Sequence, residues 1–238
     1  MVSIAGSKKL KRQMAPLFWG ITRKEKRFVI TVKPGPHKKS YSIPTAVFLR
    51  DTLKIVTSLR EAKTAIYSGK VKIDGVVRKS LHHAIGLMDV VELENVSDIY
   101  RLVPTEGKIL KPIKINESEK SKKLVRVVTK TSINKETTQT GFHDGRSTLA
   151  EVKAGVGDTC VMQIPDQKIL DIIKLEAGCQ GLVVRGINAG QIGKVESVEE
   201  GTFILPKRVI LILGDKKIEI PADIIMPIGK EEPVIQLK

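Results

Sequence analysis

Cysteine, histidine and aromatic residues are scarce in this chain of 238 residues. The two cysteines, Cys160 and Cys179, form neither a CxxC pair nor a metal-like spacing. We therefore expect two unpaired thiols in a reducing compartment. The adjacent His82 and His83 have no cysteine and few acids nearby, so no metal site is expected. Aromatic residues make up 4% of the chain, which excludes base stacking as the main binding mode over its whole surface.

Long apolar runs and the common enzyme motifs are also absent. No run approaches the length of a membrane span, and the basic residues between Lys8 and Arg12 interrupt any signal-peptide core. We expect a cytoplasmic protein with no membrane partner. No P-loop, GxSxG, HExxH or GxGxxG stands between a strand and a helix. The sequence therefore predicts no enzyme, no cofactor and no small-molecule substrate.

Positive charge is what the chain has in excess. Its net charge is +15, and residues 1–40 hold 11 Lys and Arg against one acid. This concentration predicts a phosphate-rich partner and a basic arm that threads along RNA and folds on binding. Phe18 and Trp19 either stack on a base or fix the arm to the body. The candidate RNA contacts in the arm are Lys8, Lys9, Lys11, Arg12, Arg23, Lys24, Lys26, Arg27, Lys38 and Lys39.

The stretch from Ser58 to Gly75 predicts a rigid corner made of a helix, a strand and a hairpin turn. Ser58 and Glu61 have the spacing of a capping box, which starts a helix. Gly69 supplies the left-handed residue that ends the helix. The dipeptide Asp74-Gly75 predicts a tight turn, because both of its residues must adopt positive φ. Such a corner, decorated with basic residues, suits a nucleic-acid backbone better than a substrate pocket.

The basic residues of this corner are the leading candidates for phosphate contacts. They lie on the helix and on the following strand, where apolar and basic residues alternate. A merely solvated charged face is the alternative interpretation. We favour phosphate binding because both charged faces flank the same turn at Gly69. The candidates are Arg60, Lys63, Lys70 and Lys72, extended by Arg78 and Lys79.

The remaining pattern predicts few helices and many short strands. We expect an apolar helical face from Pro44 to Ile55, a short helix at 167–173 and a loop at 115–123. The expected strands lie near 70–73, 76–79, 89–94, 99–103, 124–128, 161–164, 181–184, 192–195, 202–205, 208–213 and 216–220. Many short strands with regular turns are typical of small β-barrels. The expected fold class is therefore α+β and predominantly β.

Segment 41–105 resembles the S-four type RNA-binding domain, a small αβ module of ribosomal proteins, pseudouridine synthases and some tRNA synthetases. The resemblance is carried by Ser58-Leu59-Arg60-Glu61-Ala62, Ile66, Gly69, Val71, Ile73-Asp74-Gly75-Val76 and Gly86-Leu87-Met88-Asp89-Val90-Val91.

A second resemblance covers residues 181–196, GLVVRGINAGQIGKVE, which are similar to the KOW motif of ribosomal and transcription-elongation proteins. The family loop usually carries two arginines, and here Ile187 and Gln191 stand in their places. The loop therefore either packs as structure or contacts RNA through its backbone and Asn188. Arg185 and Lys194 flank it and complete the candidate contacts.

The order of these parts resembles the archaeal and eukaryotic small-subunit ribosomal protein family called S-four-e, over nearly the whole chain. YSIPTAVFLRDTLK and GDTCVMQIPDQKIL also look like that family. The resemblance implies a structural protein that binds 16S-type rRNA and other small-subunit ribosomal proteins and supports subunit assembly and translation. The expected parts are a basic extension (1–40), an S-four-like domain (41–105), a central β domain (106–174) and an SH3-like KOW domain (175–238).

Two other functions fit parts of the sequence. An rRNA-modifying enzyme would need a catalytic aspartate, for which Asp144 beside Arg146 is the candidate. Too little chain remains for a catalytic domain, and Asp-Gly-Arg is also a typical turn. A KOW-type transcription-elongation factor would bind polymerase, but the charge of the arm favours RNA.

Overall fold

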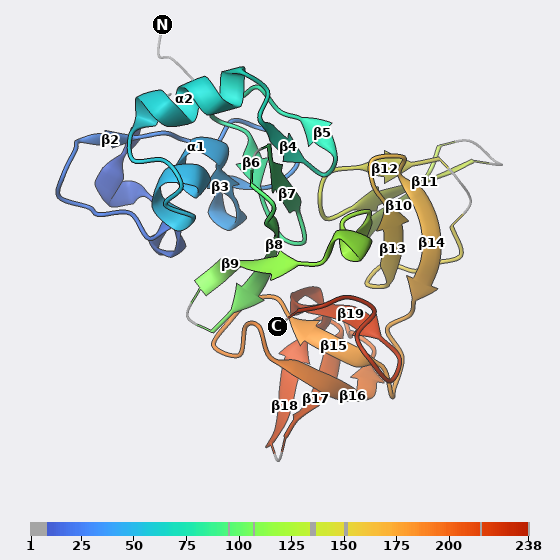
Figure 1. The fold of residues 1–238 in the computed structure, drawn as a ribbon. Coiled ribbons are helices and arrows are strands. Elements are labelled where there is room, and N and C mark those ends of the chain that lie inside the picture. Colours follow the sequence, from blue (N-terminus) through green and yellow to red (C-terminus); the bar gives the residue numbers. More distant parts are fainter. Residues whose placement is uncertain are drawn as a thin grey trace, which may run out of the picture.

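The computed structural model describes residues 9–94, 96–106, 108–133, 137–149, 152–214 and 216–237. The fold is predominantly β, as expected. Three five-stranded antiparallel sheets follow one another along the chain, and the arm and the helices cover one end of the molecule (Figure 1). Within the described residues, no helix is long and apolar enough to cross a membrane.

The arm is folded onto the body. Its paired strands and short 3-10 helices are β1 (Leu10–Lys11), β2 (Phe28–Val29), Arg12–Met14, Leu17–Trp19 and Lys39–Tyr41. Trp19 is buried, and its indole Nε1–H donates to the Ser42 carbonyl at 2.8 Å. The expectation that the arm folds only on binding is therefore wrong for residues 9–40, because Leu10, Trp19 and Val32 enter the main core. Trp19 fixes the arm to the body.

The helical part consists of α1 (Thr45–Val47), a π-helical turn (Phe48–Thr52) and α2 (Leu59–Tyr67), beside the short strands β3 (Ile43–Pro44) and β6 (Ala84–Ile85). The predicted first helix is too long, because Pro44 pairs with β6 and Lys54 has a φ of 56°, which ends the helical turn. Ile55 therefore lies outside the helix and is exposed.

The first large sheet has the order β5-β4-β7-β8-β9. Its strands are β4 (Val71–Ile73), β5 (Val76–Val77), β7 (Val90–Leu93), β8 (Ile99–Thr105) and β9 (Lys108–Ile115). The Asp74-Gly75 turn joins β4 to β5 with both residues at positive φ, as predicted. Strand β9, which the sequence did not predict, pairs with β8 and is followed by a 3-10 helix at Glu117–Glu119.

The central sheet has the order β12-β11-β10-β13-β14. Its strands are β10 (Lys122–Ser132), β11 (Thr138–Phe142), β12 (Ser147–Thr148), β13 (Thr159–Gln163) and β14 (Lys168–Ile173). The helix predicted at 167–173 is wrong. Gln167 adopts a φ of 61°, and the residues after it pair with β13 as an antiparallel hairpin. The loop predicted at 115–123 is also too long, because β9 includes Ile115 and β10 begins at Lys122.

The C-terminal sheet has the order β18-β17-β16-β15-β19. Its elements are β15 (Gln180–Val183), β16 (Ile192–Glu199), β17 (Arg208–Leu213), β18 (Lys216–Pro221), a 3-10 helix (Ala222–Ile224) and β19 (Ile225–Gly229). The strand predicted at 202–205 is wrong. Thr202 N–H donates to the Leu205 carbonyl and closes an exposed turn, so these apolar residues have no neighbouring strand to pair with.

One hydrophobic cluster joins all three sheets. It contains Met88 and Val103 from the first sheet region, Leu124 and Val161 from the central sheet, and Leu182 and Met226 from the C-terminal sheet. The C-terminal tail returns to this junction, where Ile235 and Leu237 are buried. The corner predicted from the sequence and the two β regions after it therefore share a core.

Candidate nucleic-acid interface

The corner from Ser58 to Gly75 folds as the sequence predicts. Ser58 Oγ accepts from Glu61 N–H at 3.2 Å, and the Glu61 carboxylate accepts backbone N–H groups of Thr57 and Ser58. These bonds, above all the one from Thr57, hold the pKa of Glu61 below its usual value. Gly69 ends the helix with a φ of 84°. The helix start and its end are thus both fixed by local chemistry.

The structure places two basic residues of this corner in one groove. Arg60 and Lys70 line the same shallow groove of about 420 Å³ along α2. The Lys79 side chain lies beside Gly69. Lys63 is exposed on α2, and Lys72 is exposed on the face of β4 opposite the buried Val71 and Ile73. Arg78 is only half-exposed, and its charge contributes to the lowered pKa of the half-buried His83, for which partial burial is the main cause.

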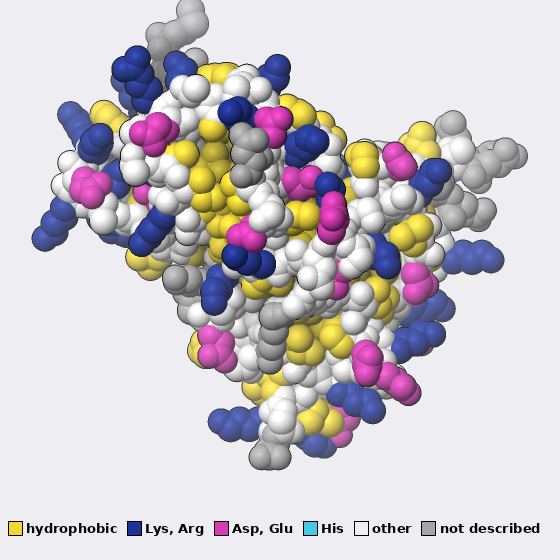
Figure 2. Space-filling view, in the orientation of Figure 1, with side chains coloured by type: hydrophobic (Ala, Val, Ile, Leu, Met, Phe, Trp, Pro, Cys, Tyr) yellow, Lys and Arg dark blue, Asp and Glu magenta, His cyan; other side chains and the backbone are white. Residues whose placement is uncertain are grey.

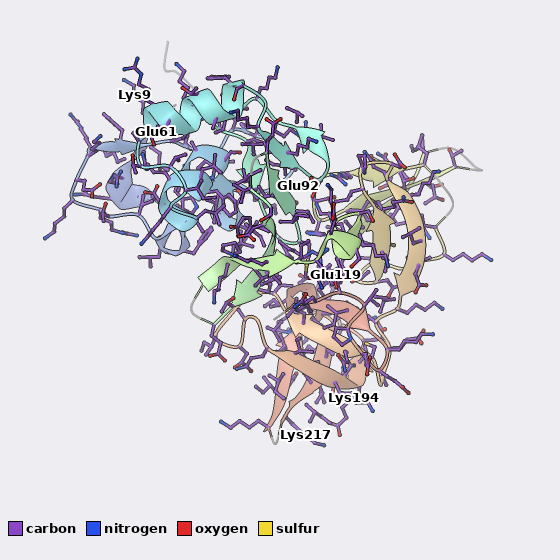
Figure 3. The ribbon with its side chains drawn as sticks, viewed as in Figure 1. Lys9, Glu61, Glu92, Glu119, Lys194 and Lys217 are labelled. Atoms are coloured by element: carbon purple, nitrogen blue, oxygen red, sulfur yellow. The ribbon has the colours of Figure 1, made fainter. Side chains whose placement is uncertain are left out.

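The arm contributes exposed cations at the end of the molecule that carries α2. Figure 3 shows Lys9 at the same end as Glu61 of α2, and Figure 2 shows basic side chains projecting around this end. Phe28 is exposed between Lys9 and Arg27, which lie 5.7 and 5.3 Å from its ring centroid. Cations over an exposed aromatic ring give a surface that can receive both a phosphate and a base. Exposed lysines complete this surface at Lys11, Lys24 and Lys26.

Three predicted contacts of the arm differ from the rest. Lys8 lies outside the described residues. Arg12 is buried, 3.5 Å from Glu25, so protein atoms rather than solvent surround its guanidinium. Arg23 donates to the carbonyls of Gln13 and Ala15 at 3.0 and 3.2 Å. Arg12 and Arg23 therefore hold the arm in its fold.

The KOW-like loop lies between β15 and β16 and packs against the protein itself. A Cβ on Gly190 would come within 2.7 Å of Pro104 and Thr105 in β8, so only glycine fits this approach. Gln191 donates its side-chain amide to Glu106 at 2.6 Å. Asn188 is half-buried, and its carbonyl accepts from Gln191 N–H at 3.2 Å. At this point the loop approaches β8.

The flanks of that loop lie in different places. The Arg185 guanidinium lies 3.9 Å from the Tyr41 ring centroid, close to Lys38 and Lys39 of the arm. Lys194 lies in β16 in the C-terminal sheet, at the opposite end of the molecule from Lys9 (Figure 3). The structure therefore joins Arg185 to the arm and leaves Lys194 apart.

A buried ionic cluster connects the corner to the central sheet. Lys123 Nζ lies 2.7 Å from Asp74 Oδ2, 2.6 Å from Asp89 Oδ1 and 3.1 Å from Asp144 Oδ2, and all four residues are buried. Burial opposes the charge of Lys123, but its three carboxylate neighbours outweigh burial and raise its pKa. Burial and repulsion from Asp89 raise the pKa of Asp74.

The same cluster includes the arm. His37 Nε2 lies 3.0 Å from Asp89 Oδ2, and a Cβ on Gly86 would come within 2.3 Å of the His37 ring. Arg146 lies 2.7 Å from Asp74. Burial disfavours the charge of Asp89, but His37 and Lys123 overcome it and hold its pKa well below the usual range. This cluster was not predicted from the sequence, in which its only signal is single charges beside apolar strand residues.

Asp144 is part of this cluster rather than a catalytic group. Its carboxylate is buried against Lys123 and Arg146, and its Oδ1 accepts from Arg146 N–H at 3.2 Å. Burial would raise its pKa, but these cations and His143 lower it. Both cysteines are free and buried, and burial raises the pKa of Cys160 to about 11. The described residues contain no cluster of His, Cys, Asp or Glu that could hold a metal ion.

Comparison with known proteins places the chain in a family. A model described as ribosomal family S4e matches residues 96–169, and one described as RS4NT (NUC023) domain matches residues 5–40. The chain is 37% identical to "Small ribosomal subunit protein eS4" of Staphylothermus marinus and 39% identical to that of Desulfurococcus amylolyticus. Each match covers 100% of this chain and 98% of the relative.

A solved structure agrees with these matches. The 30S ribosomal protein S4e from Thermoplasma acidophilum superposes with a TM-score of 0.68 and 28% identity, covering 80% of this chain and 96% of the other. Sequence similarity and fold similarity therefore indicate the same family, and the structural match extends over most of both chains. This chain belongs to ribosomal family S4e.

Proposed function

We propose that this protein is a structural constituent of the cytoplasmic small ribosomal subunit, where it binds 16S-type rRNA and neighbouring ribosomal proteins and supports assembly and translation. The observation that carries the proposal is the group of cations around the Gly69 turn. Arg60, Lys63, Lys70 and Lys72 surround one rigid corner, and a phosphate backbone is the polyanion that such a corner fits.

The corner with its sheet acts in this proposal as an S-four-like module. The C-terminal sheet acts as the SH3-like KOW unit. The exposed cations of the arm extend the contact surface along the RNA, while Arg12 and Arg23 keep the arm folded. RNA helices are recognised mainly through backbone and shape, so sequence-specific reading of paired bases is minor. The proposed parts remain 1–40, 41–105, 106–174 and 175–238.

The proposed phosphate contacts are the exposed cations of three segments. They are Lys9, Lys11, Lys24, Lys26, Arg27, Lys38 and Lys39 in the arm, Arg60, Lys63, Lys70, Lys72 and Lys79 at the corner, and Arg185 in the KOW-like loop. Arg78, Asn188 and Lys194 are secondary candidates, because Arg78 and Asn188 are half-buried and Lys194 lies apart.

Sedimentation of the tagged protein through a sucrose gradient tests the proposal. We expect the wild-type chain to migrate stoichiometrically with small subunits. Reversing the charges of Arg60, Lys63 and Lys70 to Glu should release it to the top of the gradient. Reversing Lys216 and Lys217 of β18 should not. Absence of the wild-type protein from small subunits refutes the function, and equal effects of both variants refute the assigned surface.

A further inference from the structure

A cleft of about 830 Å³ lies where the arm meets the central and C-terminal sheets. Its walls come from the arm segment 32–41, from β10 and β11, from the residues that follow β15, and from Asp223 and Met226 around the start of β19. Leu87 and Leu110 also line it. This volume falls within the range of about 300–1,000 Å³ typical of small-molecule sites. Residues far apart in the sequence, such as Tyr41 and Arg185, meet across it.

The charge of the cleft selects an anionic ligand. Five basic residues line it and one acid, Asp223, accompanies them. The five are Lys33, Lys38, Lys39, Arg126 and Arg185. The three lysines are exposed, and no ion pair engages them within the described residues. Arg126 is held on backbone carbonyls, including that of Ile225 at 3.0 Å, so the lysines and Arg185 form the accessible positive rim.

The inner wall of the cleft selects a flat apolar group. Val32, Leu87, Leu110, Phe142, Val184 and Met226 line it. At its edge the Arg185 guanidinium covers the Tyr41 ring at 3.9 Å. A cation stacked on an aromatic ring offers a planar surface on which a nucleobase can stack. An acidic peptide without aromatic residues would use the basic rim but has no flat group for this wall.

We infer that this cleft binds the base of an unpaired RNA nucleotide, with its phosphates on the lysine rim. The inference rests on the proposed function as an rRNA-binding protein and adds a second mode of contact to the phosphate contacts of the corner. An unpaired nucleotide is required, because the bases of an A-form helix are stacked and cannot enter a cleft. The bound base stacks beside Tyr41 and Arg185.

The test uses the full chain and a short single-stranded oligo-uridylate with one central 2-aminopurine, because uridines stack weakly and leave the free probe fluorescent. Stacking should quench the fluorescence of the 2-aminopurine on binding. Val128→Glu places a negative charge in the cleft lining, whereas Val156→Glu adds the same charge at an exposed position outside it. We expect Val128→Glu to weaken binding about tenfold and Val156→Glu to have little effect, since one stacked base supplies about that much affinity. Arg185→Gln, at an exposed position, should also lose the quenching.

The remaining outcomes separate the inference from the function on which it rests. Binding without quenching, or equal affinity of both glutamate variants, overturns the cleft as the site while binding to small-subunit rRNA still supports the function. Equal affinity for AMP would identify a free nucleotide as the ligand and overturn the RNA assignment. Displacement by an acidic peptide at equal affinity would show simple anion binding and also overturn it. Failure to bind the rRNA at all overturns both proposals.

Discussion

Lys123 shows how much depends on one buried charge. Its ammonium contacts three buried carboxylates that come from two turns next to strands of the first sheet, at Asp74 and Asp89, and from the turn after β11. Removing one partner from such a cluster leaves charges without compensation in a medium that solvates them poorly. Through Lys123, the cluster therefore fixes the corner and the arm against the central sheet.

We expect Lys123→Met to lower the free energy of unfolding by about 3–5 kcal/mol, because three buried carboxylates lose their shared cation. Lys217→Met is the matched control, since Lys217 pairs with Glu196 on the exposed face of the C-terminal sheet. An exposed pair contributes about 1 kcal/mol or less. Urea unfolding of both variants measures the difference. Similar losses in the two proteins would show that the buried cluster contributes no more than a surface pair.

His143 gives the protein a predictable dependence on pH. Its Nδ1 accepts from Arg126 N–H at 3.0 Å, so this nitrogen carries no proton in the fold. Burial lowers the pKa of His143 from 6.5 to about 4, and Lys123 and His37 add to this effect while Asp144 opposes it. Between these pH values the unfolded chain binds more protons than the folded one, so stability falls as pH falls.

We therefore expect wild-type stability to decrease from pH 6.5 to about pH 4 by on the order of 3 kcal/mol more than that of His143→Gln. The comparison is made as a difference between the two pH profiles, because Asp74 titrates in both proteins with a raised pKa and contributes the opposite slope. Parallel profiles would mean that folding does not lower the pKa of His143.

At the scale of elements, α2 depends on its capping box. We expect Ser58→Ala to weaken the helix start by about 1 kcal/mol, because the N–H of Glu61 loses its acceptor. Hydrogen exchange in residues 59–64 should then become about fivefold faster. Ser68→Ala at the other end of the helix is the control, since Ser68 only donates to the Ala65 carbonyl. Equal acceleration in both variants would argue against the cap.

The corner was predictable from the sequence because its signals are local. The capping box, Gly69 and Asp74-Gly75 each fix a few neighbouring dihedral angles, and all three appear in the structure. The predictions for segments 167–173 and 202–205 were wrong, because the conformation of each segment depends on whether a strand far away in the sequence pairs with it. The first pairs with β13 and so is a strand, whereas the second has no partner and forms a turn.

The candidate site was predictable only in part, because some of its contacts join residues that are far apart in the sequence. Exposed cations of the arm and corner can be read from charge and alternation. The meeting of Arg185 with Tyr41, and of Lys123 with three aspartates, depends on how the sheets pack. No spacing along the chain encodes those contacts. The burial of Arg12 was missed likewise, because every cation of the arm was taken as a possible RNA contact and the arm was expected to fold on binding.

At the scale of the whole molecule, the shared core holds the cationic surface of the corner and arm in a fixed position relative to the cleft. The cluster that joins the three sheets includes the C-terminal residues Ile235 and Leu237, and Gln236 N–H donates to Glu119 at 3.1 Å. The corner, the arm and the cleft are therefore parts of one connected body. In the proposed function, a rigid arrangement of this kind presents its cations to RNA without a large cost of ordering them.

This arrangement predicts how the affinity for small-subunit rRNA depends on salt. Each phosphate that a cation neutralises releases counterions, so the logarithm of the binding constant should fall linearly with the logarithm of the salt concentration. Lys70→Gln removes one proposed contact at the groove and should reduce this slope by about one. Lys217→Gln, with the same loss of charge at the far end of the molecule, should leave the slope unchanged. Filter binding over a salt series measures both. Equal reductions would show that the affinity for RNA depends on the net charge of the chain and not on a contact at the α2 corner. Only a local contact can distinguish two lysines that carry the same charge.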